Sequence, residues 1–307
     1  MSRERLYVCM TMDVERINAF YRGGPPTWEF AERSVRSYCG LLAEHGMPAT
    51  LFVVPDTATH QGKMLREVAR ETGAELGMHL HPEGWGDHYR NREAYDCLGG
   101  YSREEQHRML AGALEQVTEG FGTRPRAFRP GNCSANDATF GVLADLGFTH
   151  GSVSQPGRAA SSRKAVWKDA CLDVHRAHGA FRMVAGDLDF IEVPIVSDQE
   201  RSDHWTGVGD VRFEAANPAQ VTKAVQQHVA RQVEEAVPLK HVCLFTHNTV
   251  NFWSAEESER GRRGVLEASI SKIRDSVEEL DLEVKGATIA DVREAFLEAE
   301  QEVGTKG

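Results

Sequence analysis

Short apolar runs alternate with helical patterns along this chain of 307 residues, and that alternation restricts the fold more than any other feature. The first three strand patterns lie at 6–11, 49–54 and 75–80, and helical patterns at 27–46 and 63–72 separate them. The order β, α, β, α, β implies parallel strands that are joined by helical crossovers.

The alternation continues through the rest of the chain. Further strand patterns lie at 126–130, 149–153, 189–196 and 241–246, and further helical patterns at 102–119, 136–146, 218–235 and 254–280 and after 288. Because we find no repeat, linker or composition break, we expect residues 1–307 to form one α/β domain of seven or eight βα units, closed or nearly closed into a barrel. The irregular polar segment 155–187 is expected to be an insertion or a lid over one rim.

The composition limits the partners. The formal net charge of −11 argues against nucleic acid and anionic membrane surfaces, because both bind basic proteins. The first residues, MSRERLYVCM, contain no apolar signal segment, and no later run is as long as a membrane span, so we expect a cytoplasmic protein. The six cysteines lack metal-knuckle spacing and are expected to be reduced thiols. The sequence leaves the oligomeric state open.

Two histidines end the third strand pattern, ELGMHLHP. Side chains alternate along a strand, so His79 and His81 leave the same face, about 6 to 7 Å apart. Two such imidazoles can bind one metal ion. The plain alternative is that they line the solvated face of an ordinary strand.

Ionisable residues also follow other strand patterns. Asp13 and Glu15 follow the first, Arg129 ends a later one, and His247 follows LFT. In a barrel of parallel strands these ends meet at the C-terminal rim, where the chemistry of such folds is found. A carboxylate with two imidazoles is the ligand set of a catalytic zinc-type site, so the sequence favours a metal centre. Arg129 could instead pair with any buried acid, and His247 could cap a strand end.

The ordered motifs TMDVE, PATLFVV, ELGMHLHP, FRPGNCSAN, LADLGFTHGSV, IEVPI and LFTH resemble those of the polysaccharide deacetylase (NodB homology) family, carbohydrate esterase family four, in its intracellular branch with an LHP motif. The resemblance covers roughly Leu6 to His247. It implies a distorted (β/α)7 barrel that hydrolyses N-acetyl or related amide groups with one divalent metal ion, commonly zinc and sometimes cobalt or nickel. The family also includes hydrolases of cyclic amides.

The resemblance also implies roles for individual residues. Asp13 matches the general base, Arg129 the arginine that holds this aspartate, and His247 the general acid. The family's metal-binding aspartate falls on Val14, so Glu15 is expected to replace it. His79 matches the first metal histidine.

The position of the second metal histidine is Glu83, so His81 is expected to supply the second imidazole, with Glu83, Asp87 and His88 in reserve. The predicted metal site therefore comprises Asp13, Glu15, His79 and His81. Trp85 and Trp253 are candidates for an apolar platform under a flat substrate, although such residues are as often packing.

Three functions remain open at this point. The first is deacetylation of an N-acetylated sugar or saccharide precursor, and the second is hydrolysis of a non-sugar amide such as a cyclic imide or ureide. The third is a catalytically silent binding protein, because the replaced aspartate could mean that the metal ion is lost. Metal content separates the third from the others, and substrate profiling separates the first two.

Overall fold

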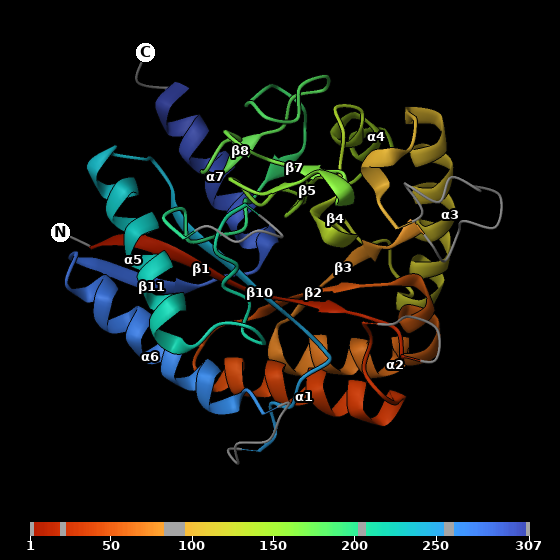
Figure 1. Cartoon of the computed structure of the whole chain (residues 1–307), viewed down its shortest axis with the longest axis horizontal. Helices are drawn as coiled ribbons and strands as arrows, with labels where there is room; N and C mark the ends of the chain where they lie inside the picture. The colour runs from red at the N-terminus through yellow and green to blue at the C-terminus, as the bar shows by residue number, and fades with distance from the viewer. Residues whose placement is uncertain (1–2, 19–22, 83–95, 202–206, 255–260, 305–307) are drawn as a thin grey trace.

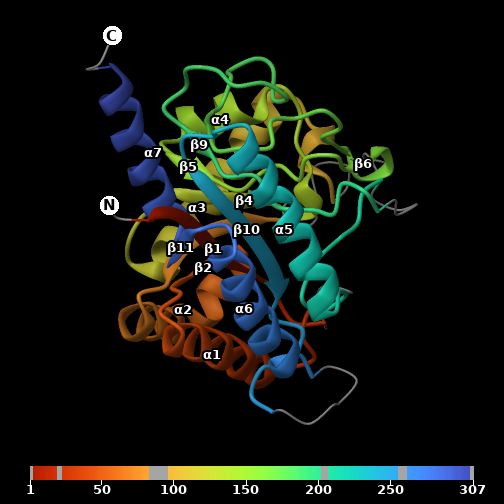
Figure 2. The same cartoon turned by 90° about the vertical axis from the view of Figure 1, so that its left-hand side faces the viewer.

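A curved sheet of mostly parallel strands forms the centre of the protein (Figure 1 and Figure 2). The computed structural model describes residues 3–18, 23–82, 96–201, 207–254 and 261–304. Its strands are β1 Glu4–Val14, β2 Ala49–Val53, β3 Glu75–Leu80, β4 Ala127–Pro130, β5 His150–Gly151, β6 Ala159–Ala160, β7 Ala165–Val166, β8 His175–Arg176, β9 Ile191–Glu192, β10 Lys240–His247 and β11 Leu282–Gly286. Its α-helices are α1 Trp28–Glu44, α2 Pro55–Thr72, α3 Arg103–Phe121, α4 Thr139–Asp145, α5 Pro218–Glu234, α6 Arg263–Glu278 and α7 Ile289–Gly304.

The strand order of the sheet is β10-β1-β2-β3-β4-β5-β9-β8, with β11 also paired to β1. All neighbours from β10 to β9 run parallel, and only β8 is antiparallel to its neighbour. After β9 the chain turns towards the other edge of the sheet, where the Val196 N–H donates to the Cys243 carbonyl of β10 at 2.9 Å. This contact brings the two edges together, and the predicted distorted (β/α)7 barrel is confirmed.

Helices cover the outside of the sheet because each presents an apolar stripe to it. Figure 1 shows α6, α1, α2 and α3 in succession along one outer side. The α1 helix begins as its sequence predicts, with the Thr27 hydroxyl accepting from the Phe30 N–H at 3.1 Å. In the described part of the chain, no helix combines the length and apolar character needed to span a bilayer.

The α2 helix begins at Pro55, earlier than the expected residue 63. Proline suits the first turn of a helix because it lacks an N–H that would find no partner there. Gly62, which interrupts the apolar pattern, lies where α3 approaches most closely: a Cβ atom at this position would be 2.2 Å from the Gly120 carbonyl oxygen. The glycine therefore serves helix packing and does not end the helix.

Other element boundaries also differ from expectation. The helix predicted over 254–280 begins at Arg263, and residues 255–260 of that range lie outside the described part. The strand β11 was not expected, yet it pairs in parallel with β1 from Glu4 to Val8. Within segment 155–187, β6 and β7 form a short antiparallel pair and β8 joins the main sheet.

Candidate active site

Strand register brings the predicted residues together at the C-terminal rim of the barrel. Asp13 of β1 is directly opposite His247 of β10, and His79 of β3 is opposite Arg129 of β4. Asp13, His79 and Arg129 are 4%, 1% and 1% exposed, so their polar groups must find partners within the protein.

Glu15, His79 and His81 form a group whose ligand atoms all lie within 4.8 Å of one another. The Nε2 atoms of His79 and His81 lie 3.4 and 3.0 Å from Oε1 of Glu15. Asp13 stands at the edge of this group, with Oδ2 3.9 Å from Nε2 of His79. The chain therefore offers one carboxylate and two imidazoles at a buried position, with a second carboxylate beside them.

The hydrogen bonds of the two imidazoles suit a metal ion. Nδ1 of His79 lies 2.8 Å from the Arg129 carbonyl oxygen, so it is the protonated nitrogen and the Nε2 lone pair faces Glu15. Nδ1 of His81 lies 2.7 Å from Oδ1 of Asp96, which orients the second ring in the same way. Glu15, His79 and His81 could hold a cation, whose positive charge would offset the repulsion between the carboxylate and the Nε2 lone pairs.

The pKa values of this group also indicate a site for positive charge. Burial alone would lower the pKa of His81, but the charges of and hydrogen bonds to Glu15 and Asp96 raise it well above its ordinary value. Burial alone would raise the pKa of Glu15, but the charges and hydrogen bonds of His81 and His79 hold it well below its ordinary value.

The local backbone is shaped for this arrangement. A Cβ atom on Gly131 would lie 2.5 Å from the ring of His81, so only glycine leaves room for the imidazole. The Asn248 side chain accepts from the Glu15 N–H and donates to the Glu15 carbonyl oxygen, both at 3.0 Å. Gly131 therefore leaves the space that the His81 ring occupies, and Asn248 holds the backbone of Glu15 in place.

Arg129 holds Asp13 from inside the barrel. Its Nη1 atom donates to Oδ1 of Asp13 at 2.8 Å and to the Thr11 hydroxyl at 2.7 Å, and its Nε atom donates to the Ser152 carbonyl at 3.2 Å. The guanidinium carbon also lies 4.4 Å from the centre of the Phe52 ring. The carboxylate thus has one oxygen fixed and the other directed towards the imidazoles.

His247 approaches the other side of Asp13 and is oriented by Glu214. Nε2 of His247 lies 3.8 Å from Oδ2 of Asp13, while Nδ1 is hydrogen-bonded to Oε1 of Glu214. Burial would lower the pKa of His247, but the Glu214 charge and hydrogen bond raise it. The pKa of Glu214 itself is lowered to about 2, because the charge and hydrogen bond of His247 outweigh its burial.

Sequence reasoning missed Asp96 and Glu214. Both lie in segments without strand or helix periodicity, so nothing in the sequence showed that they reach the imidazoles.

Among the predicted residues, Trp85 and the reserve ligands Glu83, Asp87 and His88 lie outside the described residues. Trp253 lies against α1, with its ring centre 4.9 Å from that of Phe30 and 4.5 Å from the Arg33 guanidinium carbon.

A second group of potential ligands, Asp173, His228 and His241, differs from the first in chemistry. Both carboxylate oxygens of Asp173 already accept from Arg231, at 2.6 and 2.9 Å. The Gln232 amide donates to Asp173 at 2.7 Å and to Nδ1 of His241 at 3.0 Å. Protein donors therefore occupy both oxygens of Asp173 and Nδ1 of His241, and a guanidinium already supplies the positive charge.

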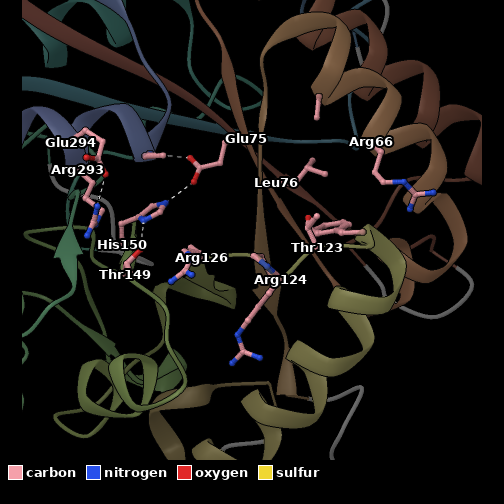
Figure 3. Close-up of a pocket in the computed structure, with 14 residues that line it drawn as sticks. Arg66, Glu75, Leu76, Thr123, Arg124, Arg126, Thr149, His150, Arg293 and Glu294 are labelled. Atoms are coloured by element: carbon pink, nitrogen blue, oxygen red, sulfur yellow. Dashed lines mark hydrogen bonds and ion pairs between the residues drawn. The ribbon is translucent and has the colours of Figure 1, made fainter.

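A pocket of about 580 Å³ lies at the opposite end of the barrel (Figure 3). It is lined by Glu75, which begins β3, whereas His79 lies near the end of that strand. Two of its arginines, Arg66 and Arg124, donate to the carbonyl oxygens of Gly120 and Leu146 near helix C-termini. Figure 3 shows the Glu75 carboxylate turned towards His150, and Oε1 of Glu75 lies 2.6 Å from Nε2 of His150. Because it lies at the start of β3, this pocket is separate from the candidate active site.

Comparisons with known proteins agree with this fold. The family model described as polysaccharide deacetylase matches residues 23–151. A search of curated proteins gave no match. The resemblance to the polysaccharide deacetylases is confirmed over these residues. The intracellular branch stays a prediction.

Three solved structures share the fold. A structure from Mycobacterium smegmatis assigned to the polysaccharide deacetylases is 19% identical, with a TM-score of 0.59 over 96% of this chain and 91% of that one. A structure from Pseudomonas aeruginosa with the same assignment is 15% identical, with a TM-score of 0.55 over 95% and 90%. The PuuE allantoinase is 13% identical, with a TM-score of 0.56 over 95% and 90%.

Proposed function

We propose that this protein is a metal-dependent hydrolase that removes the acetyl group from an N-acetylated sugar or saccharide precursor. The observation that carries the proposal is the convergence of two imidazole Nε2 atoms on the Glu15 carboxylate, beside Asp13 and His247. Glu15, His79 and His81 would hold the ion, with Asp13 as a further predicted ligand. The donor set suits zinc first, with cobalt or nickel as alternatives.

Amide hydrolysis needs an activated water, a stabilised oxyanion and a proton for the departing nitrogen. A divalent ion supplies the first two, because it lowers the pKa of bound water from 15.7 to about 7 and polarises the carbonyl group. Asp13 would accept the proton of the attacking water through Oδ2, the oxygen that Arg129 leaves free. A positioned base of this kind typically contributes roughly 10² to 10⁴ in rate.

His247 would then donate its proton to the departing nitrogen. The hydrogen bond from Nδ1 to Glu214 fixes the ring, so the proton to be transferred is on Nε2, the atom that faces Asp13. Because Glu214 raises the pKa of His247, the imidazolium form remains populated towards neutral pH.

Metal content and acetate release test this proposal together. We expect about one zinc-type ion per chain in the parent and loss of both the ion and the activity in His81→Ala. His107→Ala is the matched control, because His107 is exposed on α3, and it should keep both. A parent that takes up no ion when incubated with zinc or cobalt would contradict the mechanism and favour a silent binding protein.

Hydrolysis of a non-sugar amide is the second candidate. The PuuE allantoinase has the same fold, so the fold does not separate the two substrate classes. Acetate release from N-acetyl sugars alone would support the first candidate. Turnover of a cyclic ureide such as allantoin, with no acetate released from the sugars, would support the second.

Several other expectations stay predictions. They are a single domain over residues 1–307, a lid at 155–187, a cytoplasmic location, a substrate platform at Trp85 and Trp253, and the exclusion of nucleic acid and membrane as partners.

A further inference from the structure

In the turn after β5, one pair of side chains carries two buried N–H donors that find no acceptor among the described residues. They are Nε2 of Gln155 and Nε of Arg158. The two side chains are joined, since Nη1 of Arg158 donates to Oε1 of Gln155 at 2.8 Å. Gln155 is fully buried, and a buried donor without an acceptor is costly, so an acceptor belongs at this place.

The turn that carries these donors is held firmly. The Gly157 N–H donates to the Trp167 carbonyl oxygen at 2.9 Å, and the Trp167 N–H donates to the Arg158 carbonyl oxygen at 2.7 Å. The Ser197 hydroxyl donates to the Pro156 carbonyl oxygen at 3.0 Å. The donors are therefore preorganised, which reduces the entropic cost of binding a ligand.

The turn lies beside the candidate active site. It follows Ser152, whose carbonyl oxygen accepts from Arg129. The indole N–H of Trp167 donates at 2.7 Å to the carbonyl oxygen of Cys133, and Cys133 ends the short turn that begins with Gly131 beside His81. Burial raises the pKa of the Cys133 thiol, and the positive charges of Arg158 and Arg129 both oppose that rise. Both guanidinium groups therefore lie close enough to Cys133 to affect its charge.

The charge of Arg158 distinguishes an anion from other acceptors. Arg158 is partly buried, and within the described ranges its one side-chain hydrogen-bond partner is the neutral amide of Gln155. Arg212, by contrast, pairs with Asp210 at 2.6 Å and Glu214 at 3.7 Å. A water molecule would satisfy the two N–H groups, but it would not balance the guanidinium charge.

We propose that Gln155 and Arg158 form a subsite for an anionic oxygen group of the substrate, a carboxylate or a phosphate. The planar guanidinium matches the geometry of both groups, and the Gln155 amide adds a further donor. The inference rests on the proposed function and narrows it, because the N-acetylated substrate would carry an acidic group near its amide. Gln155 and Arg158 would then determine specificity without taking part in bond breaking.

Calorimetric titration of the protein as purified tests the subsite with three sugars. N-acetylglucosamine is neutral, N-acetylglucosamine 6-phosphate carries a phosphate, and N-acetylmuramic acid carries a carboxylate. We expect at least one acidic sugar to bind the parent about 10- to 100-fold more tightly than the neutral one, as expected for a hydrogen-bonded ion pair. Arg158→Gln should abolish this preference. Lys168→Gln should retain it, because it removes an exposed charge from the same segment.

A second variant separates binding from folding. In Gln155→Glu the new carboxylate would pair with Arg158 in place of the ligand, so the preference for acidic sugars should be lost while the Tm rises. In kinetics with an acidic sugar, Arg158→Gln should raise KM more than it lowers kcat.

The inference is overturned if the parent binds no acidic sugar more tightly than the neutral one, or if Arg158→Gln keeps the preference. Acetate release without any preference for acidic sugars would leave the proposed function intact and reject the subsite. If no amide is hydrolysed, the proposed function fails, and the titrations still decide the subsite.

Discussion

Arg129 donates to Asp13 at 2.8 Å in the interior of the barrel, where both side chains are almost completely buried. Replacing Arg129 by Met would leave the Asp13 carboxylate without its cation. Removing one member of a buried ion pair typically costs about 3–5 kcal/mol, so we expect a loss of that size in the free energy of unfolding. Urea unfolding measures it.

The double variant R129M/D13N provides the control for this prediction. It removes the uncompensated charge, so it should recover part of the stability while the hydrolase activity stays lost. Equal stability of the single and double variants would mean that the Asp13 carboxylate costs nothing without its cation, which would contradict the prediction. Arg36→Gln, which breaks the partly exposed ion pairs of Arg36 with Glu32 on α1 and Glu67 on α2, should cost no more than about 1 kcal/mol.

Glu214 should set the alkaline limit of activity through His247. A general acid must be protonated, so activity falls as pH rises through the pKa of His247. The Glu214 carboxylate raises that pKa, and Glu214→Gln should therefore move the alkaline limb of the kcat profile to lower pH. A profile with an unchanged alkaline limb and a uniformly lower rate would mean that Glu214 only supports the fold.

The sequence was sufficient for the residues that end strands. Asp13, His79, Arg129 and His247 follow or end apolar runs, and parallel register then brings them to one rim. Glu214 and Asp96 could not be found in this way, because they reach the imidazoles from irregular segments whose path depends on tertiary packing. β11 was missed for a related reason: it is only five residues long, and its pairing with β1 involves residues far away in sequence.

Gly131 should be essential for metal binding, because a larger residue would occupy the space of the His81 ring. Gly131→Ala would place a methyl group 2.5 Å from the His81 ring, so the ring must leave its position beside Glu15. We expect a 10- to 100-fold loss of metal affinity, about the effect of disturbing a residue that orients a ligand. Competition with a chelator measures this loss.

Gly264→Ala is the matched control. Apart from the neighbouring helix backbone, no atom of the described residues lies within 4 Å of the added methyl group, and alanine favours the α6 helix more than glycine does, so metal affinity should be unchanged. If Gly131→Ala bound metal as tightly as Gly264→Ala, His81 would not belong to the ligand set.

The two histidines of the second group of potential ligands, His228 and His241, should make the stability of the folded protein decrease in acid. Burial lowers the pKa of His228 to about 3 and that of His241 to about 4, whereas the ordinary value is 6.5. Above pH 6.5 the two histidines are neutral in both the folded and the unfolded protein, so their titration does not change the free energy of unfolding. Below it, the unfolded chain takes up protons that the folded protein does not, so stability falls as pH decreases from 6.5 to about 4, by up to ~1.4 kcal/mol per pH unit for each histidine.

His228→Gln should reduce this loss, because glutamine takes up no proton in the unfolded chain. The pKa of Asp173 is also lowered, mainly because Arg231 outweighs its burial, so its stabilising contribution also disappears in acid and the comparison must be made against the parent. Urea unfolding at pH 7.5 and pH 5.0 should give a smaller difference for His228→Gln than for the parent. His107→Gln replaces an exposed histidine on α3 that has no part in this buried group, so it should behave as the parent. Equal acid sensitivity in all three proteins would mean that His228 titrates normally in the folded protein.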